Sequence, residues 1–177
     1  MRILGIDPGY ERLGIAVLER ATSAKGYGVP RKEKVVFSEC FKTSAKLEFA
    51  DRLLLIGEEI KKVIKKYKPE VLAIETLFLN TNHKTVMRVA EARGVVIYEA
   101  IQAGLKVFEA SPPQIKIAVT GDGRASKEQV MKMVHVLLDD NPVRSREGSQ
   151  RPSASNGTDD ELDAIAIALT AFAHLKY

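Results

Sequence analysis

The periodicity of the apolar residues changes near residue 47, and this change limits the possible folds more than any other feature of the chain. Before it lie three strand-like segments, at residues 2–7, 13–20 and 34–42. The first two flank the turn-forming Asp7-Pro8-Gly9, and a loop with Gly and Pro precedes the third. Because short connections favour antiparallel neighbours, we expect these segments to form a three-stranded meander.

After residue 47, helical patterns alternate with short apolar runs. A helix is predicted over residues 47–67, with lysines on its outer face. Its expected apolar stripe comprises Leu47, Ala50, Leu53, Leu54, Ile60, Val63, Ile64 and Tyr67. Further helices are predicted over 81–103, from 112 onward, after Ser126, and from 158 nearly to Tyr177. Residues 126–129 and 158–161 have the pattern of capping boxes at the starts of the last two helices.

Two short runs between the helices read as buried strands. Residues 71–74 are apolar without alternation, which is typical of a strand covered on both faces, and residues 106–111 form a second such segment. The order of elements predicts one α/β domain over residues 1–177, with a mixed sheet of five strands flanked by helices. The first three strands are antiparallel and the later ones parallel, which is the outline of an RNase H-like domain. Residues 141–157, rich in Ser, Pro, Gly and Arg, are predicted to form a flexible loop.

Composition excludes several classes of protein. The single cysteine, Cys40, cannot form an internal disulfide or a Cys-rich zinc site, so we expect a reducing, cytoplasmic setting. The longest apolar stretch, residues 164–173, is far shorter than the ~18 residues of a membrane span, and no export signal is expected. The net charge of +4 is compatible with nucleic-acid binding without demonstrating it.

Acidic residues stand where the local pattern does not favour them. Asp7 ends an apolar strand, although Asp-Pro-Gly is also an ordinary turn signal. Glu75 ends the buried strand at 71–74, where a carboxylate is costly unless it is paired or lies at the exposed carboxyl edge of the sheet. Open α/β sheets bind ligands at that edge, but Glu75 emerging simply into solvent is the alternative.

Asp160 and Asp163 are three residues apart, so they share one face near the start of the last helix. Capping and the helix dipole account for Asp159 and Glu161. They account less well for Asp163, which lies within an apolar run. If the four acids converge, each pair at ~5 Å repels by roughly 3 kcal/mol at an effective dielectric near 20. Carboxylate-only ligation selects hard ions such as Mg²⁺ or Mn²⁺, and two such ions support in-line phosphoryl displacement.

Four motifs in order give the chain a close resemblance to the RuvC family of bacterial Holliday junction resolvases over nearly its whole length. The motifs are Ile3-Leu4-Gly5-Ile6-Asp7-Pro8-Gly9; Ala73-Ile74-Glu75 with Phe78 and Asn82; Ala92-Arg93-Gly94-Val95; and Asp160-x-x-Asp163-Ala-Ile-Ala-Ile-Ala. The first motif alone is weak, because sugar kinases and actin-like ATPases share it. The whole series in this order is specific.

The resemblance implies an RNase H-like, Mg²⁺-dependent endonuclease, with two ions per site and Mn²⁺ as a possible substitute. Asp7, Glu75, Asp160 and Asp163 match the family's catalytic metal ligands. The family acts as a homodimer on four-way junction DNA in recombination and repair. It nicks two opposed strands to leave 5′-phosphate and 3′-hydroxyl ends, and a branch-migration helicase complex of the RuvA and RuvB type is an expected partner.

The resemblance also implies contacts with DNA. Phe78 matches an aromatic residue that stacks on bases, Asn82 belongs to the same motif, and Lys116 and Lys127 match basic residues that support phosphate binding and activity. Phe78 as a core aromatic is the alternative. Lys127 begins a helix, where the dipole disfavours a cation, so an anionic partner gives it a reason. The loop at 141–157 is longer than is usual in the family, and its arginines either contact phosphate or belong to a disordered segment.

Three other functions are alternatives to a junction resolvase. The first is a shorter RuvC-like nuclease that acts on RNA or another nucleic acid. An actin-like or sugar-kinase domain would need a second Gly-rich phosphate loop, for which 177 residues leave no room. A DNA-binding module without catalysis has no use for four acids that repel phosphate. Removing those four from the 23 acidic residues leaves 19 against 27 basic ones, a difference of +8 in place of +4.

Overall fold

The computed structural model describes residues 1–20, 33–77, 83–139 and 158–175. The predicted order of elements is confirmed. The strands are β1 (Arg2–Asp7), β2 (Arg12–Arg20), β3 (Glu33–Lys42), β4 (Val71–Glu75) and β5 (Lys106–Ala110). The helices are α1 (Phe49–Tyr67), α2 (His83–Gln102), α3 (Pro112–Thr120), α4 (Lys127–Asp139) and α5 (Asp159–His174). The loop predicted at 141–157 lies outside the described residues.

The five strands form one mixed sheet in the order β3-β2-β1-β4-β5. β1 pairs antiparallel with β2, and β2 pairs antiparallel with β3. β4 lies parallel between β1 and β5. The sheet predicted from the sequence is therefore confirmed in its strand number and in its division into antiparallel and parallel parts.

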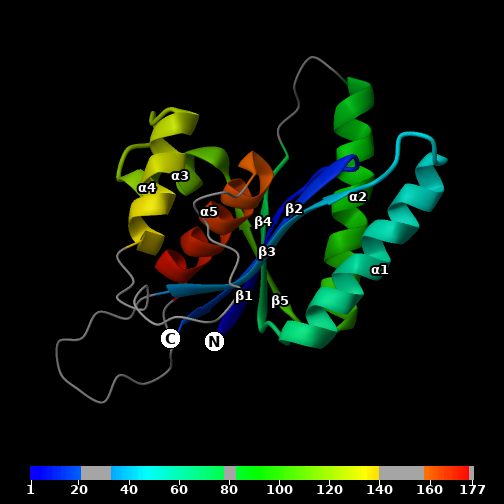
Figure 1. Ribbon diagram of the computed structural model, residues 1–177, viewed down its shortest axis with the longest axis horizontal. Coiled ribbons are helices and arrows are strands. Elements are labelled where there is room, and N and C mark those ends of the chain that lie inside the picture. Colours follow the sequence, from blue (N-terminus) through cyan, green and yellow to red (C-terminus); the bar gives the residue numbers. More distant parts are fainter. Residues whose placement is uncertain (21–32, 78–82, 140–157, 176–177) are drawn as a thin grey trace, which may run out of the picture.

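Helices cover both faces of the sheet (Figure 1). α1 and α2 lie on one face, and α3, α4 and α5 lie on the other. The side chains of β1 alternate between the two layers: Ile3 packs into the core beneath α5, whereas Leu4 and Ile6 pack into the core beneath α1 and α2.

α5 lies directly on the sheet because glycines face it. A Cβ atom on Gly5 of β1 would lie 2.2 Å from the carbonyl oxygen of Ala164, and one on Gly14 of β2 would lie 2.1 Å from that of Asp160. Real side chains do not tolerate such distances. The two glycines thus bring the start of α5 down onto the ends of β1 and β2.

The predicted apolar stripe is wrong at Leu47, Ala50 and Leu54, which are exposed. Leu47 also lies before the observed start of α1, and Leu54, at 62% exposure, is the more exposed of the two leucines. The buried line runs through Ile56, Ile60 and Val63, which leaves Leu54 at the margin beside a groove between α1 and α2. The lysines at 61, 62, 65 and 66 are exposed, as predicted.

Of the helices in the described ranges, none is both long enough and apolar enough to cross a membrane.

Candidate active site

Asp7 and Glu75 lie at the carboxyl edge of the sheet. They end β1 and β4, which are parallel neighbours in which Ile6 lies opposite Ile74, so the two acids follow at the same level. Alternation along each strand directs both side chains toward α5, because Ile3 and Ala73 on the same faces belong to the core beneath that helix. The position predicted for Glu75, at the carboxyl edge, agrees with this geometry.

The start of α5 brings the second pair of acids to the same edge. Thr158 and Glu161 form the predicted capping box, in which the Thr158 backbone N–H donates to Glu161 Oε1 at 3.3 Å. The cap fixes where the helix begins and so places Asp160 in the first turn and Asp163 one turn further along the same face. The close approach at Gly14 holds this end of the helix against β2.

Burial and the other three acids of this edge all raise the pKa of Asp7. Burial raises the pKa of Asp7 to about 7, and repulsion by Asp163, Glu75 and Asp160 adds to the effect. Burial also raises the pKa of Glu75, again with repulsion from Asp163. Within the described ranges, neither the Asp7 nor the Glu75 carboxylate has a hydrogen-bonded or ion-paired partner. The charge of Lys127 lowers both pKa values, but burial and repulsion outweigh it.

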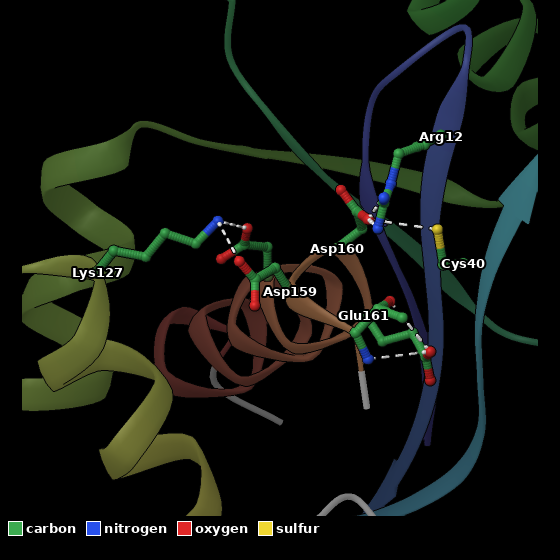
Figure 2. A network of polar contacts seen from close by, with 8 residues as sticks. Arg12, Cys40, Lys127, Asp159, Asp160 and Glu161 are labelled. Atoms are coloured by element: carbon green, nitrogen blue, oxygen red, sulfur yellow. Dashed lines mark hydrogen bonds and ion pairs between the residues drawn. The ribbon is translucent and has the colours of Figure 1, made fainter. Parts of the chain in front are cut away.

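The two helix acids are each paired with a cation, and Figure 2 shows the pairing of Asp160 with Arg12. Arg12 of β2 donates from Nε to Asp160 Oδ2 at 2.7 Å, and its Nη2 lies 2.5 Å from the same oxygen. Cys40 Sγ lies 3.3 Å from that oxygen as well. From the opposite side, Lys127 Nζ lies 3.0 Å from Asp163 Oδ2.

These partners separate the pKa values of the two helix acids. Burial favours a higher pKa for Asp160, but hydrogen bonds from Arg12 and Cys40 and the charge of Arg12 outweigh it and lower the pKa. At Asp163 burial prevails, and the pKa is raised despite Lys127. The sequence did not predict that Arg12 and Cys40 lie at the site, because no local pattern links Arg12 to a residue 148 positions away.

The backbone of Glu75 has a support of its own. Arg93 of α2 donates from Nε to the Glu75 carbonyl oxygen at 3.0 Å, and its guanidinium also pairs with Glu109 of β5. Arg93 belongs to the Ala-Arg-Gly-Val motif noted in the sequence. Its contact ties α2 to the end of β4, which carries the acid.

The donor set suits a hard divalent cation. Four carboxylates, without imidazole or thiolate among the four, match the preference of Mg²⁺ and Mn²⁺, and the raised pKa of Asp7 shows that its ionised form would be favoured by a cation nearby. Within the described ranges, no three acidic, imidazole or thiol groups lie close enough to hold one ion together. The helix acids are engaged by Arg12 and Lys127 instead, so the four acids converge electrostatically without forming a closed cage.

The predicted DNA contacts are placed only in part. Lys127 is the first residue of α4, as predicted, and its amino group reaches the acids. Lys116 lies on α3, and no hydrogen bond or ion pair joins its side chain to the acids in the described ranges. Phe78 and Asn82 lie outside the described residues.

Comparison with known proteins identifies what this arrangement resembles. The family described as "Crossover junction endodeoxyribonuclease RuvC" matches residues 3–171. A relative of the same description from Halothermothrix orenii is 39% identical over 96% of this chain and 90% of its own length. The structure of Thermus thermophilus RuvC superposes with a TM-score of 0.76 at 32% identity, covering 98% of this chain and 95% of that chain. T. thermophilus RuvC in complex with Holliday junction substrate gives a TM-score of 0.75 at 32% identity, covering 97% and 93%. The predicted RNase H-like fold is confirmed.

Proposed function

The chain belongs to the RuvC family of crossover junction endodeoxyribonucleases, and from this we propose that it resolves Holliday junctions by paired, symmetric nicks in recombination and repair. The observation that carries the proposal is the convergence of Glu75, Asp160 and Asp163 on the buried carboxyl of Asp7. T. thermophilus RuvC, a relative at 32% identity, is known in complex with Holliday junction substrate.

Asp7, Glu75, Asp160 and Asp163 are the residues that would hold the metal. The family is metal-dependent, and we infer Mg²⁺, two ions per site, with Mn²⁺ as a substitute. Bound there, the ions supply an activated water and charge stabilisation for the leaving oxygen. The protein supplies a rigid sheet edge for Asp7 and Glu75 and a capped helix for Asp160 and Asp163. The family resemblance implies products with 5′-phosphate and 3′-hydroxyl ends, and we propose the same ends here.

DNA recognition depends on basic residues around the acids. Lys127 lies beside Asp163 and is half exposed, so it can approach a phosphate next to the metal ligands. We assign Lys116 to phosphate contacts further out, Phe78 to stacking on bases and Asn82 to the same region of the junction. Phosphate contacts make binding salt-sensitive, while selectivity comes from junction shape.

A homodimer suits a substrate with two opposed strands to cut, because an isologous pair presents two identical sites. The surface that we assign to the interface is the outer face of α1 and α2. A groove of about 480 Å³ lies between the two helices there, and Leu54 and Tyr98 line it, with side chains 62% and 61% exposed. Met87 and Ile101 extend the apolar surface along α2 at helical spacing from Tyr98.

Light scattering coupled to size-exclusion chromatography tests the dimer. The wild-type protein is expected to run with the mass of two chains, and Leu54→Glu and Tyr98→Glu to shift it toward one chain. Ile117→Glu is the matched control, because Ile117 is also an exposed apolar residue but lies on α3, across the sheet. A monomeric wild-type protein would overturn this assignment.

The remaining proposals concern the cellular setting. We place the enzyme in the cytoplasm, working with a branch-migration helicase complex of the RuvA and RuvB type. The second candidate function, cleavage of RNA or another nucleic acid, is favoured by the Gly-Ile-Asp-x-Gly strand and by residues 12–17, which resemble shorter RuvC-like nucleases.

One experiment separates the candidates. The purified protein is offered a four-way junction, a linear duplex of the same sequence and an RNA–DNA hybrid, each with Mg²⁺. Paired nicks confined to the junction are expected. Efficient cutting of the hybrid would instead identify the shorter nuclease type.

A further inference from the structure

Arg12 makes the most direct contact that any cation in the described ranges makes with the four acids. Its guanidinium places two donors on one oxygen of Asp160, at 2.7 Å and 2.5 Å (Figure 2). Cys40 Sγ, at 3.3 Å, lies on the same oxygen. All three contacts fall on Oδ2, so the carboxylate is drawn toward β2 and β3.

The fold does not depend on this ion pair. The Arg12 side chain is 50% exposed, and exposed pairs contribute little to stability. α5 is held in place by its capping box, by its apolar core and by its close approach to Gly14. A guanidinium beside a carboxylate of the active edge therefore has its main consequence at the site itself.

That consequence is competition for the carboxylate. A divalent cation on Asp160 meets a fixed positive charge within a few ångströms, and the repulsion is twice that between two single charges at the same distance. Arginine cannot release its charge, because it stays protonated at any accessible pH. Either the guanidinium moves away when the ion binds, or the ion binds more weakly.

We propose that Arg12 is a positioning residue that competes with the divalent cation for Asp160 and thereby sets the metal concentration at which the site loads. The inference depends on the proposed function only in taking Asp160 as a metal ligand. In the metal-free protein Arg12 compensates one acid of the four, and Lys127 compensates a second. Asp160 is then held through Oδ2 by Arg12 until a cation replaces the guanidinium.

Titration of Mn²⁺ without DNA, followed by the loss of the free-ion electron paramagnetic resonance signal, tests the proposal. Arg12→Gln is expected to bind Mn²⁺ about fivefold more tightly than the wild-type protein, and Arg12→Lys, which keeps the charge, to stay near wild type. Lys42→Gln is the matched control, since Lys42 is an exposed cation opposite Arg12 in the β2–β3 register. It is expected to change the affinity by less than twofold. Unchanged circular dichroism spectra verify folding.

The outcomes distinguish this inference from the proposed function. In an Asp160→Asn background, Arg12→Gln is expected to change Mn²⁺ affinity by less than twofold, because the contested carboxylate is gone. Unchanged or weaker Mn²⁺ binding by Arg12→Gln would overturn the inference while leaving the metal site standing. If Asp7→Asn and Asp160→Asn both bind Mn²⁺ as well as wild type, the metal site itself is wrong, and the role of Arg12 falls with it.

Discussion

The two acids on strands and the two acids on α5 differ in how the folded protein accommodates their charge. Asp7 and Glu75 sit at the ends of buried strands, and within the described ranges no cation pairs with their side chains. Asp160 and Asp163 sit on a helix face, and each has a cation brought from another element, Arg12 from β2 and Lys127 from α4. In the described part of the chain, the strand acids have raised pKa values and no paired cation, whereas each helix acid is paired with one.

This difference indicates how the fold accommodates four acids at one edge of the sheet. The sheet holds the strand acids in place in spite of the repulsion between them. This repulsion favours the binding of a cation. The helix acids are each engaged by an ion pair, and the capping box and the close approach at Gly14 hold the start of the helix itself. Substitutions on the two sides should therefore have different effects.

The largest expected effect is on catalysis at the strand side. Asp7→Asn should lower junction cleavage about a thousandfold or more, because the central ligand of a site that supplies several kcal/mol of transition-state stabilisation is lost. Junction binding, measured by gel shift, should persist. Asp159→Asn is the control: Asp159 adjoins the helix acids but is 71% exposed, so cleavage should stay within a few fold of wild type. Cleavage that survives Asp7→Asn would sink the assignment of the site.

The second largest effect is expected where the start of α5 packs against β2. Gly14→Ala would put a Cβ 2.1 Å from the Asp160 carbonyl oxygen and 3.1 Å from Asp7 Cβ, so the helix start must move. We expect about a hundredfold slower cleavage and a loss of about 1–3 kcal/mol in the free energy of unfolding. The contrasting variant is Gly94→Ala, which has open space at its Cβ within α2 and should gain up to about 1 kcal/mol. Urea denaturation measures both, and equal stabilities would show that the close approach at Gly14 is not tight.

The third prediction compares the strand acids with the helix acids through the stability of the metal-free protein, measured in EDTA. The pKa of Asp7 is about 7 in the folded protein against 3.8 as its ordinary value, so between these pH values the folded state keeps a proton that the unfolded state releases. The free energy of unfolding therefore falls as pH rises through this window. Asp7→Asn removes that fall and should be more stable than wild type at pH 8, by on the order of 1–3 kcal/mol.

Asp160→Asn should behave in the opposite way. The pKa of Asp160 is lowered on folding, so its stabilising contribution is present above its ordinary pKa and lost as the pH falls. Replacing it should destabilise the metal-free protein at pH 8, by less than about 1 kcal/mol since Arg12 is half exposed. Denaturation at pH 5 and pH 8 measures both variants. A shift of the same sign in the two would remove the distinction between strand and helix acids.

The fold was predictable because its signals are local. The non-alternating run before Glu75 identified a central strand, and the capping boxes at Ser126 and Thr158 fixed the starts of α4 and α5. The stripe on α1 failed at Leu54, because helical periodicity defines a face only to within about one residue and the partner helix decides which margin is covered. The Asp7 side of the site was also predictable, since a carboxylate that ends a buried strand is conspicuous in the sequence.

The pairing of the helix acids was not predictable in the same way. Arg12 stands in a strand whose sequence gives no reason to notice it, and its partner is 148 positions away. Cys40 contacts the same oxygen from β3, although as the only cysteine it had served just to exclude an internal disulfide and a Cys-rich zinc site. Such contacts depend on the strand register and on the position of α5 against the sheet, and only the assembled fold defines these.

Substitution of Lys127 is expected to have the smallest effect on stability. It also tests whether the cations on the helix side serve catalysis or only folding. As the first residue of α4 it opposes the helix dipole, while its ion pair with Asp163 is half exposed. The two contributions nearly cancel, so Lys127→Gln should change the free energy of unfolding by less than about 0.5 kcal/mol. Junction cleavage should nevertheless fall by about tenfold or more, because a cation beside a metal ligand and a phosphate has been removed. A variant that loses stability but keeps full cleavage would make Lys127 a structural counter-ion, and the helix side would then differ from the strand side in folding alone.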